Sequence, residues 1–251
     1  MDCLEGFKLL DDNCIDLTVT SPPYDNLRTY NGYQLDFENI AKELYRVTKD
    51  GGVVVWVVAD KVNNGSKTCT SYKQAIYFVE IGFSLFDTII YQKTSPSAPH
   101  KGRYFNAFEY MFIFSKGKPK TVNLLYDRPN KTQGRNTGKL SKREIDGTLT
   151  TKKSIKISEY GLRTNVWTYD VGNNKSTKDK IAFKHPAIFP EQLANDHIIS
   201  WSNKDDIILD PFMGSGTTAK MAVLNNRKYI GFEISKEYCD IAKERIFESE
   251  Y

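Results

Sequence analysis

The chain has 251 residues, of which 40% are hydrophobic and 26% charged, with a formal net charge of +4 and a mean hydropathy of −0.49. This balance is typical of a soluble globular protein, and no apolar run approaches the roughly 20 residues that a membrane-spanning helix needs. The length allows one core with an inserted subdomain. The first residues do not resemble a secretory signal, so we expect a cytoplasmic protein. The four cysteines are far apart in the sequence, which predicts neither a metal site nor a disulfide framework.

Charge is distributed unevenly along the chain. Residues 94–184 hold 19 Lys and Arg against 7 Asp and Glu, a net charge of +12, whereas the remaining residues have a net charge of −8. A basic segment in an acidic body is typical of a surface that faces phosphates. A solvated loop can have the same charge, so this pattern alone favours nucleic acid only slightly.

Predicted strands and helices alternate in the first part of the chain. Cys14–Thr20 is rich in β-branched residues and predicts a strand, which must end at Ser21-Pro22-Pro23 because proline lacks an N–H for the ladder. Helical spacing of apolar residues from Phe37 predicts a helix that ends near Asp50-Gly51-Gly52. Further strands are predicted at Val53–Val58, Phe86–Tyr91 and Phe108–Phe114, with a helix over Tyr72–Val79 before the second of them.

The hydrophobic period fades after Ser115 and returns near His185, which predicts an insert over residues 116–184 between two halves of one domain, 1–115 and 185–251. Short strands are predicted inside it at Ile155–Ile157 and Asn165–Tyr169. The second half predicts, in order, a helix near Leu193–Trp201, a strand at Ile207–Asp210, a helix at Thr217–Leu224, a strand at Tyr229–Glu233 and a helix at Tyr238–Phe247. Strands that alternate with helices favour an α/β fold with a mostly parallel sheet.

A glycine turn lies between the predicted strand Ile207–Asp210 and the helix after it. The turn reads Asp210-Pro211-Phe212-Met213-Gly214-Ser215-Gly216-Thr217-Thr218, and Glu233 ends the following strand. Glycines let backbone amides approach a ligand, and a carboxylate at Glu233 can accept both ribose hydroxyls, so the pattern predicts an adenosine-containing ligand. The phosphate-loop pattern fails at two positions. A dinucleotide site fits the glycines, but the Asp210 carboxylate would repel a pyrophosphate and suits the ammonium of S-adenosylmethionine; a purely structural turn is the remaining alternative.

The second candidate site is the loop Ser21-Pro22-Pro23-Tyr24. An aromatic amino group is hard to methylate because its lone pair is delocalised into the ring. The Ser21 hydroxyl oxygen and the Pro22 carbonyl can accept the amino hydrogens and polarise the nitrogen, while the prolines hold these acceptors in place. Tyr24 can stack on a base that has been flipped out of the duplex. Taken alone, the tetrapeptide also fits a proline turn with a core tyrosine.

Together the two motifs resemble those of amino-methylating DNA methyltransferases, N4-cytosine or N6-adenine specific. Their order, with the catalytic motif first, looks like the beta group of that family. The resemblance implies a Rossmann-like α/β fold, S-adenosyl-L-methionine as the cofactor and Ser21, Pro22, Pro23 and Tyr24 as catalytic residues. The cofactor residues that it implies begin with Asp2 and Cys3 on the adenine and continue with His185, Pro186, Asp210, Pro211, Phe212, Gly214, Ser215, Gly216, Thr217, Thr218, Glu233 and Ile234.

The resemblance also implies a double-stranded DNA substrate and target recognition by the basic insert. The DNA-contacting residues that it suggests are Arg28, Lys101, Arg103, Arg128, Lys131, Arg135, Lys142 and Arg143. Many members carry a lysine where His185-Pro186-Ala187-Ile188-Phe189-Pro190 has Phe189, which is a departure from the family pattern. A homodimer and a cognate restriction enzyme are partners that the family allows, and no metal or membrane is expected.

In the family that the motifs resemble, Ser before Pro-Pro-Tyr is commoner among cytosine-N4 enzymes and Asp among adenine-N6 enzymes, so the resemblance favours cytosine slightly over adenine as the target. The alternatives are methylation of RNA or of a protein glutamine, where Asn usually precedes the prolines and the cofactor motif comes first. A dinucleotide-dependent oxidoreductase and an inactive DNA-binding relative are more distant. Ser21, Tyr24, Asp210 and Glu233, all present, argue against the inactive relative.

Overall fold

The computed structural model describes residues 1–23, 35–97, 102–138, 140–172 and 175–250. The chain divides into two compact units, one of Met1–Asn123 with Asn165–Tyr251 and one of Leu124–Thr164. The predicted insert 116–184 contains the whole second unit, and its flanks belong to the first.

The first unit is built on a seven-stranded sheet with the strand order β11-β5-β6-β2-β1-β12-β13. Only β6 runs against its neighbours, since β2 and β5 both pair with it in antiparallel register and all other pairs are parallel. The strands are β1 (Ile15–Thr20), β2 (Thr48–Val58), β5 (Ser84–Ser97), β6 (Asn106–Ser115), β11 (Val166–Tyr169), β12 (Ile207–Asp210) and β13 (Lys228–Gly231). The mostly parallel Rossmann-like sheet is therefore confirmed.

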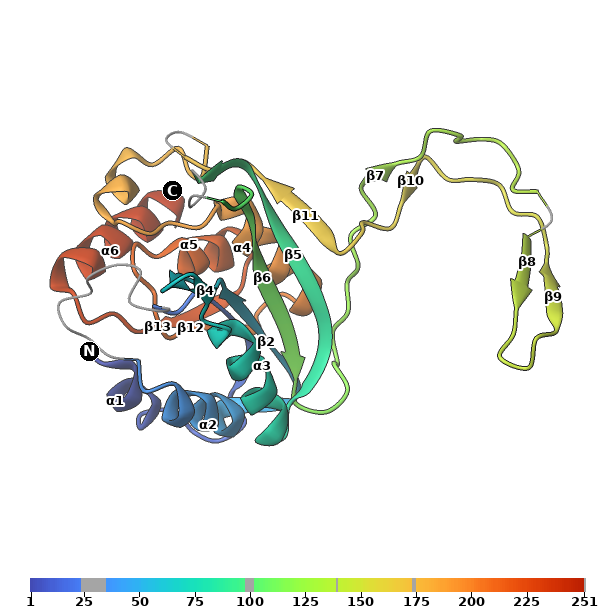
Figure 1. Ribbon diagram of the computed structural model, residues 1–251. Helices are drawn as coiled ribbons and strands as arrows, with labels where there is room; N and C mark the ends of the chain where they lie inside the picture. The colour runs from blue at the N-terminus through green and yellow to red at the C-terminus, as the bar shows by residue number, and fades with distance from the viewer. Residues whose placement is uncertain (24–34, 98–101, 139, 173–174, 251) are drawn as a thin grey trace. The chain divides into compact units, whose positions relative to one another are not determined.

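Helices cover both faces of this sheet (Figure 1). One layer holds α1 (Cys3–Phe7), α2 (Phe37–Val47) and α3 (Thr70–Glu80), and the other holds α4 (Glu191–Trp201), α5 (Thr217–Leu224) and α6 (Lys236–Glu250). A short 3-10 helix, η1 (Lys180–Lys184), contacts α6. Within the described part of the chain, every helix is too short or too polar to span a bilayer.

The sequence pattern accounts for the buried position of β2. Its stretch Val53–Val58 is buried at every residue, as expected of a central strand covered by helices on both faces. The predicted boundary before it was wrong, because α2 already ends at Val47 and β2 begins at Thr48. Gly51 continues this strand in a left-handed conformation, with φ +79°, and donates its N–H to the Lys116 carbonyl. Gly51 and Gly52, whose sequence is typical of a helix end, thus lie in the irregular first part of strand β2.

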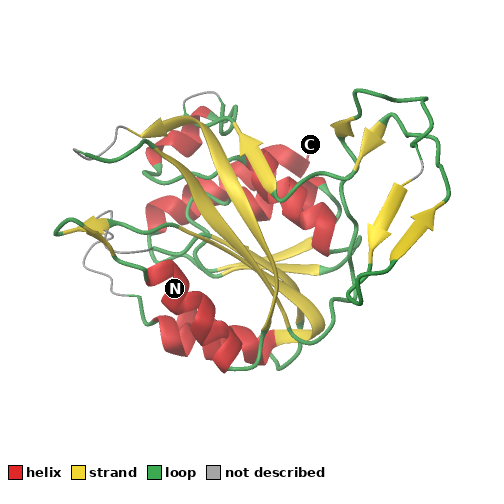
Figure 2. Cartoon of the chain, turned by 45° about the vertical axis from the view of Figure 1, so that its right-hand side comes forward, coloured by secondary structure: helices red, strands yellow, loops and turns green. Residues whose placement is uncertain are grey.

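The second unit contains two small antiparallel pairs (Figure 2). β7 (Arg128–Pro129) pairs with β10 (Tyr160–Gly161), and β8 (Leu140–Arg143) pairs with β9 (Leu149–Lys152). The predicted strand at Ile155–Ile157 was wrong, since Lys156 forms only an isolated bridge with Asn136. The predicted strand Asn165–Tyr169 is β11 and extends the main sheet instead. A further short pair in the first unit, β3 (Val62–Asn63) with β4 (Ser66–Lys67), was not predicted.

An aromatic cluster fixes α3 to the sheet. The Phe78 ring is fully buried and lies between 4.6 and 5.6 Å, centroid to centroid, from the rings of Phe37, Trp56, Phe83 and Phe114. Aromatic pairs at such distances add to the free energy of burial.

We therefore predict that Phe78→Ala lowers the free energy of unfolding by about 3–5 kcal/mol, the usual cost of a large cavity in a core. Urea denaturation measures this change. Ile76→Ala is the matched control, because Ile76 lies on the same helix with its side chain 59% exposed, and it should change stability by about 0.5 kcal/mol or less. Equal effects of the two substitutions would contradict the proposed packing.

Candidate active site

A cavity of about 1260 Å³ opens at the carboxyl ends of the parallel strands. Open α/β sheets bind ligands at this edge. Its volume exceeds the roughly 300–1,000 Å³ typical of a site for one small molecule, so the cavity has room for two ligands. The described residues that line it all belong to the first unit.

The cavity brings together two motifs that are about 190 residues apart in the sequence. β1 pairs in parallel with β12, with Thr18 opposite Leu209, so both strands end at the same place. Ser21, Pro22 and Pro23 follow β1 and line the cavity. Tyr24 and Arg28 lie outside the described residues, as does Lys101. The structure therefore places the acceptors of the predicted catalytic loop beside the glycine turn.

Most of the predicted cofactor residues also line this cavity, namely Asp2, Cys3, His185, Pro186, Pro211, Phe212, Gly214, Ser215, Thr217, Glu233 and Ile234. Asp210, Gly216 and Thr218 do not. The Asp210 carboxylate, which we expected to meet the ammonium of the cofactor, does not line the cavity, because hydrogen bonds from neighbouring residues hold it beneath the turn.

Those bonds come from both motifs. The Thr20 hydroxyl donates to Asp210 Oδ1 at 2.6 Å, and the Phe212 backbone N–H donates to the same oxygen at 3.1 Å. Asp210 is only 3% exposed, and this burial raises the pKa of its carboxyl to about 6. Thr218 adds a second link, since its hydroxyl donates to the Val19 carbonyl at 3.1 Å. Asp210 thus ties the residue before Ser21 to the first residues of the glycine turn.

The glycine turn itself needs backbone conformations that favour glycine. Gly214 and Gly216 have φ values of +51° and +80°. A Cβ on Gly214 would lie 2.9 Å from His185 Nε2, and one on Gly216 would lie 2.8 Å from the Ala242 Cβ. The turn can therefore pack closely on its neighbours and present its backbone to a ligand only with glycine at these positions.

Glu233, just after β13, accepts a hydrogen bond from the glycine turn. Its Oε2 accepts from the Gly214 N–H at 2.9 Å, and its Oε1 accepts from the Ser235 N–H at 2.8 Å. Both oxygens keep unused lone pairs, so the carboxylate can accept further hydrogen bonds from ligand hydroxyls. A glycine cradle with a carboxylate at the next strand end fits the adenosine and methionine parts of S-adenosylmethionine.

A buried ion network supports the turn from behind. Arg245 of α6 is fully buried, and its Nη1 donates to the Ser215 carbonyl at 2.6 Å. Its other nitrogens bond the carboxylates of Asp179, at 2.9 Å, and Glu191, at 2.8 Å. Lys220 of α5 bonds the same two carboxylates, at 2.7 and 2.8 Å. The network joins three helices, α4, α5 and α6, and the residue before η1 to one carbonyl of the site.

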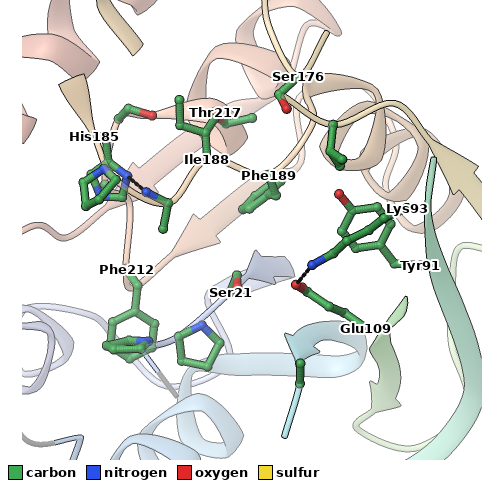
Figure 3. A pocket seen from close by; sticks show the side chains of 18 of the residues that line it. Ser21, Tyr91, Lys93, Glu109, Ser176, His185, Ile188, Phe189, Phe212 and Thr217 are labelled. Carbon is green, nitrogen blue, oxygen red and sulfur yellow. Dashed lines mark hydrogen bonds and ion pairs between the residues drawn. The ribbon is translucent and has the colours of Figure 1, made fainter. Parts of the chain in front are cut away.

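His185 and Phe189 line the cavity from the segment that follows η1. The His185 ring packs edge-on against Tyr238, with 4.4 Å between centroids, and its Nδ1 accepts from the Ala187 N–H at 3.1 Å. Figure 3 shows Ser21 between this side of the cavity and a Lys93–Glu109 pair on the opposite side.

Sequence reasoning missed several residues of the site. Lys93, Glu109 and Tyr91 lie on β5 and β6 and line the cavity, as does Asp60, which accepts from the Ser71 N–H and hydroxyl at 2.9 and 2.7 Å. Asp60 follows the apolar stretch of β2, so the rule that singled out Asp210 at a strand end could have found it. No sequence signal marks Lys93, because its facing partner is set by strand pairing.

The predicted DNA-contacting residues fall in both units. Arg103 lines the cavity and donates to the Gly65 carbonyl. The second unit carries 10 Lys and Arg against 4 Asp and Glu, and includes Arg128, Lys131, Arg135, Lys142 and Arg143, all with exposed side chains. No group of three or more His, Cys, Asp or Glu side chains that could hold a metal is found among the described residues.

Fold and site together define a Rossmann-like methyltransferase with a cofactor cradle beside a Ser-Pro-Pro loop. The model of the N6/N4 DNA methylase family matches residues 15–244. The chain is 64% identical to the orphan methyltransferase M.BamHII of Bacillus amyloliquefaciens, over 94% of this chain and 90% of that protein. It is 30% identical to the type II methyltransferase M.BglII of Bacillus subtilis, over 93% of this chain and 64% of the relative.

Solved structures agree in fold. The cytosine-N4-specific PvuII DNA methyltransferase superposes with a TM-score of 0.69 at 22% identity, over 98% of this chain and 84% of that one. The complex of M1.HpyAVI with S-adenosylmethionine gives a TM-score of 0.62 at 22% identity, over 98% of this chain and 96% of that one. The chain belongs to the N6/N4 DNA methylase family and is a DNA methyltransferase that modifies an amino group of cytosine or adenine. Its cofactor is S-adenosyl-L-methionine.

The raised pKa of Asp210 predicts a particular pH dependence of stability. The folded carboxyl binds its proton up to about pH 6, whereas the unfolded one loses it near its ordinary value of 3.8. The native state therefore binds more protons between these values, and its stability falls as pH rises from about 4 to 6. Asp210→Asn removes this effect. We predict that the unfolding free energy of the variant rises by about 3 kcal/mol relative to the wild type across this range.

Urea denaturation of the protein without cofactor, at half-unit steps from pH 3.5 to 7, measures this difference. Other titrating groups contribute equally to the unfolding free energies of the two proteins, so their contributions cancel in the difference. A difference that stays constant across the range would contradict a raised pKa at Asp210.

The network behind the turn predicts an effect on cofactor affinity. Arg245→Met removes the donor to the Ser215 carbonyl and leaves the carboxylates of Asp179 and Glu191 with one cationic partner, Lys220, in place of two. We therefore predict that the Kd for S-adenosylmethionine rises on the order of tenfold to a hundredfold. Isothermal titration calorimetry measures this, with circular dichroism to check folding. Arg245→Lys should recover only part of the affinity, because one ammonium cannot replace a planar guanidinium. Lys243→Met, an exposed change on the same helix, is the control and should leave the Kd unchanged.

Proposed function

We propose that this enzyme transfers a methyl group to N4 of cytosine in double-stranded DNA, after the target base has been flipped into the cavity. The observation that carries the proposal is the cavity shared by Ser21 and Pro22 with the glycine turn. A base within a duplex cannot reach such an edge of the sheet, so it must leave the stack.

The chain's own groups supply the polarisation that amino methylation needs. The Ser21 hydroxyl oxygen and the Pro22 carbonyl accept hydrogen bonds from the two amino hydrogens, which draws the nitrogen lone pair out of the ring. These acceptors face the positive charge that develops on nitrogen during attack and therefore stabilise the transition state. Pro22 and Pro23 restrict the backbone, so little reorganisation is required when the base enters. By sequence, Tyr24 is assigned to stacking on the base.

The cofactor is assigned to the turn side of the cavity. Glu233 is placed to accept the ribose hydroxyls, Asp2, Cys3 and Ile234 to border the adenine, and Gly214–Thr217 with His185 and Pro186 to hold the methionine part. When bound, S-adenosylmethionine supplies an electrophilic methyl group on its sulfonium. Asp210 is assigned a positioning role, because its carboxylate bonds Thr20 and Phe212 and sets the spacing between the two loops.

DNA is assigned to the basic residues of the second unit. Its 10 Lys and Arg residues against 4 acidic ones suit contacts with phosphates, which position a duplex without reading its sequence. Arg103, on the cavity wall, is placed to contact the strand that carries the flipped base, and by sequence Arg28 and Lys101 are assigned there as well.

Ser21 in place of an acidic residue supports cytosine over adenine as the target. The relative at 64% identity is named an orphan methyltransferase, and we extend that description to this chain in place of a cognate restriction enzyme. Long-read sequencing of DNA from cells that express the protein tests these points together, because it distinguishes N4-methylcytosine from N6-methyladenine. Methylated adenine alone would overturn the choice of base, and unmodified DNA would overturn the activity.

Ser21→Ala provides a quantitative test of the polarising role. We predict a loss in kcat of about a hundredfold, the usual effect of removing one preorganised polar group, with an unchanged Kd for S-adenosylmethionine. Single-turnover transfer of a tritiated methyl group to the identified duplex measures it. Ser84→Ala, an exposed change on β5, is the control. An equal loss of cofactor affinity in Ser21→Ala would contradict a role confined to the amino group.

A further inference from the structure

The cavity wall opposite the cofactor turn carries a charged pair. Lys93 of β5 donates from its ammonium to Glu109 Oε1 of β6, and both residues line the same cavity as Ser21. The two strands are direct neighbours, with Tyr91 opposite Glu109 in the ladder. Figure 3 shows the pair meeting on the side of the cavity that faces Ser21. The pair is therefore placed to meet a base whose amino group lies at the Ser-Pro-Pro loop.

The pair is partly withdrawn from water and rigidly held. The side chains of Lys93 and Glu109 are 19% and 12% exposed. The Lys93 ammonium lies 5.6 Å from the centroid of the Tyr91 ring, which packs against the Tyr169 ring at 5.8 Å. The Tyr169 hydroxyl in turn donates to the Asp196 carboxylate at 2.8 Å. A partly buried ion pair contributes little net stability, and this pair borders the cavity, so its charged groups are within reach of a ligand there.

We propose that Lys93 reads the target base by donating a hydrogen bond to its O2 carbonyl edge. This inference rests on the proposed function, since it assumes that the base lies with its amino group at Ser21. Cytosine offers an amino group, N3 and O2 along one edge. Adenine offers its amino group and N1, followed by a carbon-bound hydrogen. An ammonium is a donor only and finds an acceptor at the third position of cytosine alone.

Glu109 has a second role beside Lys93. Attack by the amino nitrogen builds positive charge on the base, and a lone ammonium on the same ring would oppose it. The Glu109 carboxylate neutralises the charge of the Lys93 ammonium and fixes its orientation. The ammonium can therefore donate a hydrogen bond to the base without adding net positive charge near the reacting atom. Lys93 is thus a specificity residue, and Glu109 positions it and offsets its charge.

The test compares base choice in matched duplexes. Wild type and Lys93→Met are given the methylation site found by sequencing, with either cytosine or adenine at the target position, and kcat/KM is measured for each. Lys93→Met should reduce the preference for cytosine about tenfold to a hundredfold, the value of one good polar contact to a base edge. Lys93→Arg keeps a donor and should retain most of the preference. Lys49→Met, which breaks the Lys49–Asp16 pair outside the cavity, should leave it unchanged.

Glu109→Gln is a second variant that keeps the ammonium. It should lower kcat on the cytosine duplex about tenfold or more while the preference for cytosine persists, a separation that a general loss of folding does not produce. A thermal shift on adding S-adenosylmethionine checks that each variant is folded.

The outcomes separate this inference from the proposed function. A wild type that methylates only adenine overturns both. A wild type that methylates cytosine, with an unchanged preference in folded Lys93→Met, overturns the reading role of Lys93 alone. Should Lys93→Met not fold, Lys93→Arg and Glu109→Gln decide, and a preference lost in Lys93→Arg or a kcat unchanged in Glu109→Gln counts against the proposal.

Discussion

The site depends on buried hydrogen bonds between distant parts of the chain, and one of the shortest joins Thr20 to Asp210. Thr20 and Asp210 end neighbouring parallel strands, and the 2.6 Å bond between them fixes the distance from the Ser-Pro-Pro loop to the glycine turn. Methyl transfer requires the attacking nitrogen and the methyl group to be in line at close range, so the rate is sensitive to small displacements of either loop. Burying the Asp210 carboxylate costs free energy, and this cost falls at the point where the spacing of the two loops affects the rate most.

The sheet places different groups on the two sides of the cavity around this bond. One side of the cavity is formed by the turns after β12 and β13, reinforced by Arg245, and it suits a cofactor with fixed structure. The other side is formed by β5 and β6, which present Lys93, Glu109 and aromatic rings. The Ser-Pro-Pro loop lies between them. The two sides of the cavity are thus formed by different strands and turns, which suits the proposed placement of a cofactor on one side and a base on the other.

The sequence predicted most of the first unit, because its strands and helices have regular apolar periods and its loops carry glycine and proline. β12 and α5 were predicted to the residue. Errors arose where a local signal had two meanings, as at Gly51, which continues a strand instead of ending a helix. The inward direction of the Asp210 carboxylate and the pairing of Lys93 with Glu109 were not predictable, since both depend on contacts between segments that the sequence does not place side by side.

The second unit leaves the first after Asn123 and returns at Asn165, and both ends are fixed within the first unit. The Asn123 N–H donates to the Ser200 carbonyl at 2.8 Å, and the Asn165 carbonyl accepts from Ile90 at 2.8 Å. Both points where the chain passes between the two units are therefore held by hydrogen bonds within the first unit. If the second unit contacts DNA as proposed, that segment can change in length and sequence between related enzymes while the first unit keeps its sheet and cavity, because surface segments tolerate such changes far better than a core does.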